Sequence, residues 1–349
     1  MKKIRMGVIG LAGIGKNHIA GIQGSKDAEL VALCDINRDT LQKSGIQYEI
    51  PEAMLFDNHE EMILCPEIDA ISICTPNNTH FPIAMDAIEH EKPFALEKPT
   101  ALDTEEVRLL KEAADKCGIR HMITFSYRYK TAARFARRLV ADGHLGEIRH
   151  VYGQYFQGWA LNPELPLIWR FNKAITGSGA LGDLGSHLLD LIRFIVGDIT
   201  KVSSQTGTFI ETRKHPESGL PVKVDVDDYC NVMATLSNGA SATLAITRHA
   251  MGRGNYQRFE VYGTKGGLVY NLEDSDTLDI CLGTISGNAK DYHRIALPDN
   301  CRSDQMQAFF DIFNGKGDGL SATLVDGLAN QVLLDAILES AESGTWITI

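Results

Sequence analysis

The sequence contains no uninterrupted apolar run that approaches 18 residues, so we expect no membrane-spanning helix. Basic residues are also in deficit, since 34 Lys and Arg against 45 Asp and Glu give a net charge of -11. This balance argues against a nucleic-acid backbone or an anionic membrane as the main partner. The seven cysteines include no C-x-x-C pair, and an odd number does not suit a disulfide framework. Such a set fits a reducing compartment, so we expect a cytoplasmic protein.

The N-terminus imitates a secretory signal, because basic residues within 1–5 precede a weakly apolar run at 6–15. That run is rich in glycine, however, and Lys16, Asn17 and His18 follow it at once. Its removal would also delete the first strand predicted below. We therefore expect this segment to belong to the folded chain.

The 349 residues are enough for two domains, and the pattern of elements changes near residue 126. Before that point short apolar segments alternate with helices, which predicts a parallel, doubly wound sheet of the Rossmann type at residues 1–125. Its strands are expected at residues 4–10, 29–35, 69–75, 93–96 and 119–125, with helices at 14–24 and 104–116.

In residues 126–349 strands follow one another without intervening helices, which predicts a large open, mostly antiparallel sheet. These strands are expected at residues 148–157, 199–209, 229–236, 240–248, 257–263, 268–271 and 277–282. Helices are expected at residues 131–142, 303–314 and 322–343. The sequence therefore predicts a first domain at 1–125 and a second at 126–349.

A glycine-rich loop follows the first strand, and its residues are Gly10, Leu11, Ala12, Gly13, Ile14 and Gly15. The loop fits the pattern G-x-G-x-x-G with Ala12 in place of the second glycine. Gly10 permits a tight turn, and Gly15 permits close packing of helix on strand. The N–H groups at the start of the next helix can then hold a pyrophosphate, so the loop predicts a dinucleotide site.

The second strand ends at Asp35, which lies 20 residues after Gly15. An acid at about this distance hydrogen-bonds the ribose hydroxyls of NAD, and its charge repels the 2′-phosphate of NADP. A plain helix cap is the alternative role for Asp35. Arg38 lies close by and softens the preference, so we expect NAD as the cofactor with NADP possible.

Two later strands end in polar residues, at the edge where open α/β sheets bind ligands. The loop after the strand at 69–75 supplies candidate cofactor contacts, namely Thr75, Pro76, Asn77 and His80. The strand at 93–96 runs into Glu97, Lys98 and Pro99, and Glu97 and Lys98 are further candidate cofactor contacts. Pro99 restricts Lys98 to an extended backbone and so holds it rigidly. The alternative for Glu97 and Lys98 is an ordinary surface pair.

Asp183, His187 and Asp190 follow one another at positions i, i+4 and i+7, so on a helix they share one face. Apolar residues recur at a similar spacing beside them, which favours the helix. Gly185 would leave room for a molecule that docks between Asp183 and His187. The alternative is a buried helix whose histidine has ordinary hydrogen-bond partners.

Aromatic residues and arginines gather before this segment, in a loop that contains Trp159, Trp169 and Arg170. Aromatic faces suit the apolar side of a pyranose ring, and Arg170 can donate to its hydroxyls. Tyr127, Arg128 and Tyr155 are further candidates for substrate contact. A loop packed on the domain surface is the alternative. No cluster of His, Cys and Asp has convincing metal-ligand spacing, so we expect no metal.

Four motifs occur together in this order: the glycine loop, Thr75-Pro76-Asn77 with His80, Glu97-Lys98-Pro99, and Asp183-x-Gly185-x-His187. With the two-part fold they resemble the glucose–fructose oxidoreductase/inositol dehydrogenase family of NAD(P)-dependent enzymes. The resemblance implies oxidation of a ring hydroxyl on a sugar or cyclitol, or the reverse reduction. It also implies that residues 126–349 bind this small polyol and associate into a homodimer or homotetramer.

The resemblance makes Lys98, Asp183 and His187 the catalytic set, drawn from both halves of the chain. The chemistry agrees, because a histidine titrates near pH 7 and can take the hydroxyl proton. A lysine can stabilise the developing alkoxide, and an aspartate can orient a hydroxyl or the imidazole. Two alternatives stay open: a non-catalytic sensor that binds a dinucleotide or sugar, and a dihydrodiol- or biliverdin-type reductase.

Overall fold

The N-terminal part of the chain forms a six-stranded parallel sheet in this computed structural model, which describes residues 2–273, 276–283 and 291–349. The strand order is β3-β2-β1-β4-β5-β6, and every neighbouring pair is parallel. The strands are β1 (Ile4–Ile9), β2 (Ala28–Cys34), β3 (Leu55–Phe56), β4 (Ala70–Ile73), β5 (Phe94–Leu96) and β6 (His121–Ile123). The prediction of a doubly wound parallel sheet is confirmed.

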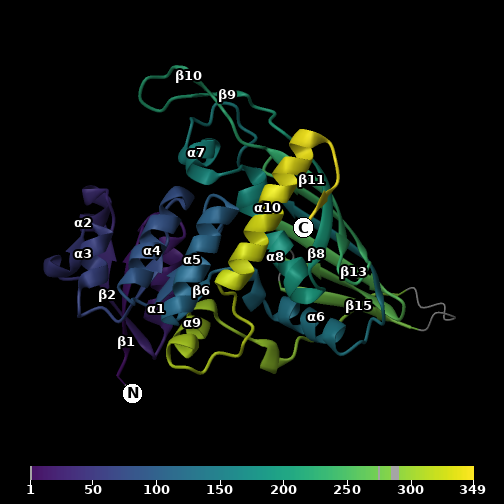
Figure 1. Ribbon diagram of the computed structural model, residues 1–349, viewed down its shortest axis with the longest axis horizontal. Coiled ribbons are helices and arrows are strands. Elements are labelled where there is room, and N and C mark those ends of the chain that lie inside the picture. Colours follow the sequence, from purple (N-terminus) through teal and green to yellow (C-terminus); the bar gives the residue numbers. More distant parts are fainter. Residues whose placement is uncertain (1, 274–275, 284–290) are drawn as a thin grey trace. The chain divides into compact units, whose positions relative to one another are not determined.

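Helices connect these strands, and the sequence explains where several of them begin and end (Figure 1). They are α1 (Gly15–Gly24), α2 (Arg38–Gln47), α3 (His59–Leu64), α4 (His80–Glu89) and α5 (Thr104–Cys117). The Asp103 side chain caps α5 by accepting from the backbone N–H of Glu106, and Gly118 ends the helix at φ 66°. Their apolar faces bury Ile73, Leu96 and other strand residues in one core.

The chain divides into two units, and the division is not the simple one that the sequence suggests. Unit 1 comprises Met1–Phe125 and Asp304–Gln331, and unit 2 comprises Ser126–Ser303 and Val332–Ile349. Residues 304–331 therefore belong with the Rossmann sheet rather than with the second part of the chain. In unit 1, helix α9 (Gln305–Phe313) packs against α1 and β6. Helix α10 (Leu324–Ser343) contributes residues to both units.

Unit 2 is built on a nine-stranded sheet with the order β16-β15-β14-β13-β7-β12-β11-β8-β17. Neighbours are antiparallel except for β7 and β12. The longer strands are β7 (Ile148–Phe156), β8 (Ile199–Gly207), β11 (Tyr229–Leu236), β12 (Ser241–Thr247), β13 (Tyr256–Gly263), β14 (Gly266–Asn271) and β15 (Thr277–Leu282). The expected open, mostly antiparallel sheet is thus confirmed.

The sequence does not reveal the short strands, because two or three residues carry no periodic pattern. These are β16 (His293–Arg294), β17 (Ile347–Thr348) and the separate pair β9 (Thr212–Lys214) and β10 (Pro221–Lys223). Helices α6 (Thr131–Ala141), α7 (Lys173–Thr176) and α8 (Ser186–Ile195) also belong to unit 2 (Figure 1). Helix α8 contacts both α6 and β7. Among the described residues no helix is long and apolar enough to span a membrane.

Candidate active site

The glycine loop has the geometry that a dinucleotide requires. Gly10 has φ 88°, and a Cβ there would lie 2.7 Å from the Cys74 carbonyl oxygen, so the end of β4 leaves no room for a side chain. A Cβ on Gly15 would collide with the Gly10 carbonyl oxygen, which shows how closely α1 packs on the loop. A Cβ on Gly13 would meet no heavy atom within 4 Å. Ala12 and Ile14 are exposed, so the loop adjoins open space.

Asp35 faces this loop from the end of β2. Its Oδ2 accepts a hydrogen bond from the Leu11 N–H at 2.9 Å, and its Oδ1 accepts from the Asn37 N–H at 2.9 Å. These bonds fix the carboxylate while leaving lone pairs on both oxygens for ribose hydroxyls. Arg38, at the start of α2, forms an ion pair with Asp57.

The loops after β4 and β5 are joined by His80. Its Nδ1 lies 2.7 Å from the Pro99 carbonyl oxygen, and its Nε2 lies 2.9 Å from the Thr75 carbonyl oxygen. The ring is buried, and this burial lowers the pKa of His80. His80 therefore supports the Thr75-Pro76-Asn77 loop from inside, which differs from the cofactor contact that we expected of it. Asn77 is buried as well, whereas Pro76 is exposed.

Glu97 is buried and holds the end of β5 through charged and neutral hydrogen bonds. Its Oε1 lies 2.9 Å from Nε2 of His18 on α1 and accepts from the Thr124 hydroxyl at 2.6 Å. Burial opposes the charge on Glu97, but His18 outweighs it and lowers the pKa of the carboxyl to about 2. Glu97 is thus an internal anion, not half of a surface pair. Lys98 follows it, half-buried, with a cis peptide bond to Pro99.

Asp183 does not lie on the regular helix that the spacing suggests. It belongs to a π-helical segment, Leu181–Gly185, which leads directly into α8. Asp227 caps this segment, because its carboxylate accepts from the N–H groups of Gly179 at 2.6 Å and Leu181 at 2.8 Å. Wide turns of this kind occur often at functional sites. Asp183 is therefore presented by a specially built turn.

Gly185 serves packing rather than docking. A Cβ at this position would lie 2.9 Å from Cδ1 of Leu181 and 3.2 Å from Cδ1 of Ile246 on β12. The glycine therefore lets the π-helical segment approach the sheet. This finding corrects the expectation that Gly185 keeps space for a docked molecule.

Arg170 and Trp169 lie next to Asp183. Nη1 of Arg170 donates to Oδ1 of Asp183 at 3.2 Å. The Arg170 guanidinium also lies 4.4 Å from the centre of the Trp169 ring. All three side chains are partly exposed, so a ligand can reach them. The structure thus brings together one acid, one cation and one aromatic face.

Two tyrosines surround His187 on α8. The Tyr127 ring centre lies 4.6 Å from that of the imidazole in an edge-on arrangement, and the Tyr155 ring lies 6.3 Å away. The two hydroxyls are 2.5 Å apart. Burial raises the pKa of both tyrosines, so their hydroxyls stay protonated and can donate hydrogen bonds.

Asn255, which no sequence motif marks, is hydrogen-bonded to both tyrosines of this cluster. Its Oδ1 accepts from the Tyr155 hydroxyl at 2.7 Å and from Nε2 of Gln157 at 3.0 Å. Its Nδ2 donates to the Tyr127 hydroxyl at 3.1 Å. Asn255 comes just before β13 and carries no motif, so only the fold reveals it. Gln157 follows β7 directly, and a polar residue at a strand end is a sequence feature that could have marked it as a site candidate.

Arg128 and Asp190 form a buried ion pair with each other. Nε and Nη2 of Arg128 donate to the two carboxylate oxygens of Asp190 at 2.8 Å and 2.6 Å. Both side chains are at most 5% exposed. Arg128 thus lies inside unit 2, in contrast to the substrate contact that the sequence led us to expect. Asp190 is the third residue of the i, i+4, i+7 series, and its role here is structural.

Two buried arginines tether the loop that carries Trp159 and Trp169. Arg213 donates to the carbonyl oxygens of Ala160 at 2.6 Å and of Asn162 and Leu165 at 2.9 Å. Arg248 donates to the Arg170 carbonyl oxygen at 3.3 Å, and its guanidinium lies 5.2 Å from the centre of the Trp159 ring. The loop is therefore held in a defined shape by unit 2.

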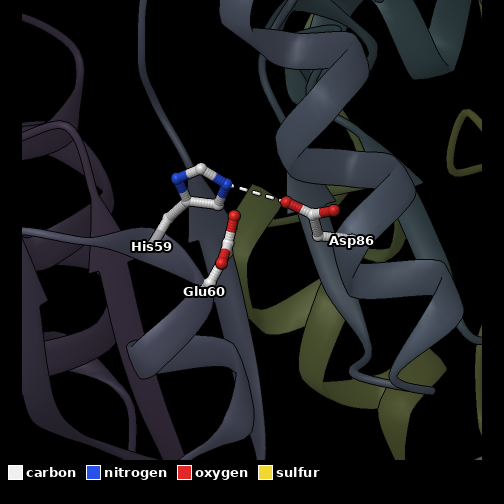
Figure 2. Close-up of side chains that lie close together, drawn as sticks. All are labelled: His59, Glu60 and Asp86. Atoms are coloured by element: carbon white, nitrogen blue, oxygen red, sulfur yellow. Dashed lines mark hydrogen bonds and ion pairs between the residues drawn. The ribbon is translucent and has the colours of Figure 1, made fainter.

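In the part of the chain that the structure describes, one group of side chains has ligand atoms close enough for a metal ion, although the sequence spacing did not suggest it. It consists of His59, Glu60 and Asp86, whose ligand atoms lie within 4.8 Å of one another. Figure 2 shows the His59 ring facing the Asp86 carboxylate, with Glu60 beside it. Nε2 of His59 is hydrogen-bonded to Oδ2 of Asp86 at 2.8 Å, which joins α3 to α4. This bond accounts for the arrangement, and we assign it a structural role.

Comparison with known proteins agrees with this fold and these motifs. Residues 4–125 match the model of the oxidoreductase family with an NAD-binding Rossmann fold, and residues 133–269 match the GFO/IDH/MocA C-terminal domain. A levoglucosan dehydrogenase from Pseudarthrobacter phenanthrenivorans is 32% identical over 314 residues, which cover 81% of this chain and 80% of that protein. The chain belongs to the GFO/IDH/MocA family of NAD-binding oxidoreductases.

Further relatives span the whole chain. An inositol 2-dehydrogenase from Rhizobium meliloti is 26% identical and covers 99% of both chains. Among solved structures, levoglucosan dehydrogenase in complex with NADH and L-sorbose superimposes with a TM-score of 0.91 at 29% identity. That comparison covers 100% of this chain and 99% of the other. The expected family and the NAD cofactor are thus confirmed.

Proposed function

We propose that this NAD-dependent dehydrogenase oxidises a ring hydroxyl of a sugar or cyclitol, or reduces the corresponding ketone. The observation that carries the proposal is the grouping in unit 2 of Asp183, Arg170 and Trp169 and of His187 with its two tyrosines. Charged and hydroxyl groups can bind a polyol's hydroxyls, while aromatic faces suit the apolar face of its ring. Relatives named for levoglucosan and inositol support the same substrate class.

The cofactor would be held by residues of unit 1. The loop from Gly10 to Gly15 offers backbone N–H groups to the pyrophosphate, and Asp35 offers its carboxylate to the ribose. The loop from Thr75 to Asn77 lies at the same edge of the sheet and completes the proposed set. NAD, when bound, supplies the hydride acceptor for the reaction.

We propose that His187 takes the proton from the reacting hydroxyl and that Lys98 stabilises the negative charge that develops on its oxygen. An imidazole is basic enough near neutral pH to take a hydroxyl proton, and an ammonium group stabilises the alkoxide that develops. Asp183 is proposed to accept a hydrogen bond from a neighbouring substrate hydroxyl. Its pairing with Arg170 keeps the carboxylate oriented in unit 2.

A substrate panel tests the proposal. The purified protein is mixed with NAD and in turn with levoglucosan, glucose, glucosides and inositols, and NADH formation is followed by absorbance. We expect turnover with at least one sugar or cyclitol and a strongly reduced rate for Asp183→Asn. Tight NADH binding without turnover on any polyol would contradict the proposal and favour a sensor. Turnover only on a flat aromatic diol or tetrapyrrole would favour a different reductase.

We also propose that copies of the chain associate through the nine-stranded sheet. Met233, Thr243 and Tyr152 lie side by side across β11, β12 and β7, and all three are exposed. Tyr152 is 45% and Met233 is 53% exposed, which is unusual for central strands. A dimer or tetramer would cover this face. Sedimentation of the wild type and of Tyr152→Lys would test this, with dissociation expected in the variant.

The cytoplasm is the proposed location. All seven cysteines are free thiols, and Cys34, Cys74, Cys230 and Cys301 are buried. Buried thiols persist in a reducing compartment, where disulfides are rare. Fractionation of cells that contain the protein would test the location.

A further inference from the structure

Two acids end neighbouring strands at the edge where the adenosine half of a dinucleotide is expected. Strands β2 and β3 are parallel, with Leu33 opposite Leu55 and Cys34 opposite Phe56. Asp35 and Asp57 are the next residues of the two strands, and the Asp35 N–H still donates to the Phe56 carbonyl oxygen at 3.2 Å. The register therefore places the two carboxylate-bearing residues beside each other.

Arg38 lies at this edge of the sheet and is hydrogen-bonded to Asp57. Nε and Nη2 of Arg38 both donate to Oδ2 of Asp57, at 3.0 Å and 2.6 Å. The side chain of Arg38 is 83% exposed and that of Asp57 is 44% exposed. An ion pair this exposed contributes little to folding stability. We therefore expect the Arg38–Asp57 pair to affect the affinity for a ligand at this edge of the sheet.

We propose that Asp57 is a second determinant of selectivity for NAD over NADP, acting together with Asp35. Sites that accept NADP place a free arginine on the 2′-phosphate. Here the guanidinium is bound by Asp57, and a 2′-phosphate would meet the negative charges of both acids. Selectivity against a ligand through such a repulsive element is a general device. This inference rests on the proposed placement of the ribose at Asp35.

Asp39 provides a matched control on the same surface. It lies next to Arg38 in α2 and is exposed, so Asp39→Asn removes the same charge and leaves the Arg38–Asp57 pair in place. Asp57→Asn keeps the shape of the side chain while removing its charge. Arg38→Gln in combination with Asp57→Asn shows whether the effect passes through the guanidinium.

The experiment is a fluorescence titration of each full-length variant with NADH and with NADPH, without substrate. We expect Asp57→Asn to tighten NADPH binding by about three- to tenfold and to change NADH binding by less than about twofold. Asp39→Asn should change both affinities by less than about twofold. The double variant with Arg38→Gln should lose the gain, and Asp35→Ser with Asp57→Asn should prefer NADPH most. The NADPH gain should shrink at high salt.

An unchanged ratio of NADPH to NADH affinity in Asp57→Asn would overturn the inference, as would an equal shift in Asp39→Asn. Asp57→Ser, with its melting temperature measured, guards against a folding defect in a single variant. The titration involves no turnover, so its failure is separable from that of the proposed function. If the protein turns over a polyol but Asp57→Asn leaves the ratio of NADPH to NADH affinity unchanged, only this inference is rejected. If the ratio shifts but no polyol is turned over, only the proposed substrate class is rejected.

Discussion

His18 and Glu97 form a buried ion pair that connects the helix after the glycine loop to the strand end that bears Lys98. Nε2 of His18 lies 2.9 Å from Oε1 of Glu97, and Nδ1 lies 2.5 Å from the Ser72 hydroxyl. Burial opposes the charge on His18, but Cys74 and Glu97 outweigh it and raise the pKa of the imidazole to about 10. The pair therefore joins the helix that follows the glycine loop to the Glu97-Lys98-Pro99 segment within unit 1.

This pair predicts a particular dependence of stability on pH. Because the pKa of His18 rises to about 10 in the folded protein, its contribution is complete below about 6.5 and is lost as the pH rises toward 10. Glu97, whose pKa falls to about 2, contributes above about 4.3 and loses its contribution as the pH falls toward 2.

Urea denaturation of the wild type and of His18→Gln between pH 6.5 and 9 checks the basic limb. The wild type should lose at least about 1 kcal/mol more than the variant over this range. Equal slopes for the two proteins would show that the histidine does not hold an extra proton. Glu97→Gln should flatten the same limb, because it removes the partner that keeps the imidazole charged.

The buried Arg128–Asp190 pair predicts a large loss of stability when one partner is removed. Asp190→Ala removes the carboxylate that pairs with the buried Arg128 guanidinium and should cost about 3–5 kcal/mol. Replacing both partners, as in Arg128→Met with Asp190→Leu, should recover much of that loss. Thermal unfolding measures this, and a drop of similar size in both variants would contradict it.

Arg213 predicts a separation of substrate and cofactor effects. Arg213→Met removes the hydrogen bonds to the carbonyl oxygens of Ala160, Asn162 and Leu165, so the loop bearing Trp169 should lose its defined shape. KM should rise about tenfold or more, while NADH affinity stays within about twofold. Lys214→Met is the matched control, because Lys214 is an exposed neighbour paired with Glu164. Unchanged KM in Arg213→Met would refute the tethering role.

Ala12 tests the proposed pyrophosphate site without disturbing the core, because it is exposed on the loop. Ala12→Val should weaken NADH binding by about tenfold, since a larger side chain occupies the space where phosphate approaches the backbone. Ala12→Gly should bind NADH as well as the wild type or better. Equal NADH affinity of the Val variant and the wild type would place the dinucleotide elsewhere.

The sequence was most informative where a pattern is local. The glycine loop, the acid at Asp35 and the alternation of strands and helices all follow from short-range rules, and they identified the Rossmann sheet. The longer strands of unit 2 were recognised because they follow one another without intervening helices. The sequence did not reveal the short strands β3, β9, β10, β16 and β17 or the return of residues 304–331 to unit 1, because neither leaves a periodic signal.

The environment of each side chain was less predictable, because it depends on residues distant in the sequence. Spacing alone put Asp183, His187 and Asp190 on one helix face. Instead, Asp183 lies in a π-helical turn, which Asp227 caps and which packs against Ile246 at Gly185. Arg128 was predicted to contact the substrate, but its side chain pairs with Asp190, which lies 62 residues away in the sequence. Asn255 carries no local pattern and emerged only from its three hydrogen-bonded neighbours.

The most direct test of the account is the turnover of His187→Ala on the substrate that the panel identifies. The variant lacks the imidazole that we propose as the base for the hydroxyl proton, so kcat should fall by about 10²–10⁴-fold. NADH affinity should stay within about twofold, because the proposed cofactor residues belong to unit 1. His144→Ala, which removes an exposed histidine from the same unit, should behave like the wild type. A His187→Ala protein with near-wild-type turnover would contradict the proposed mechanism.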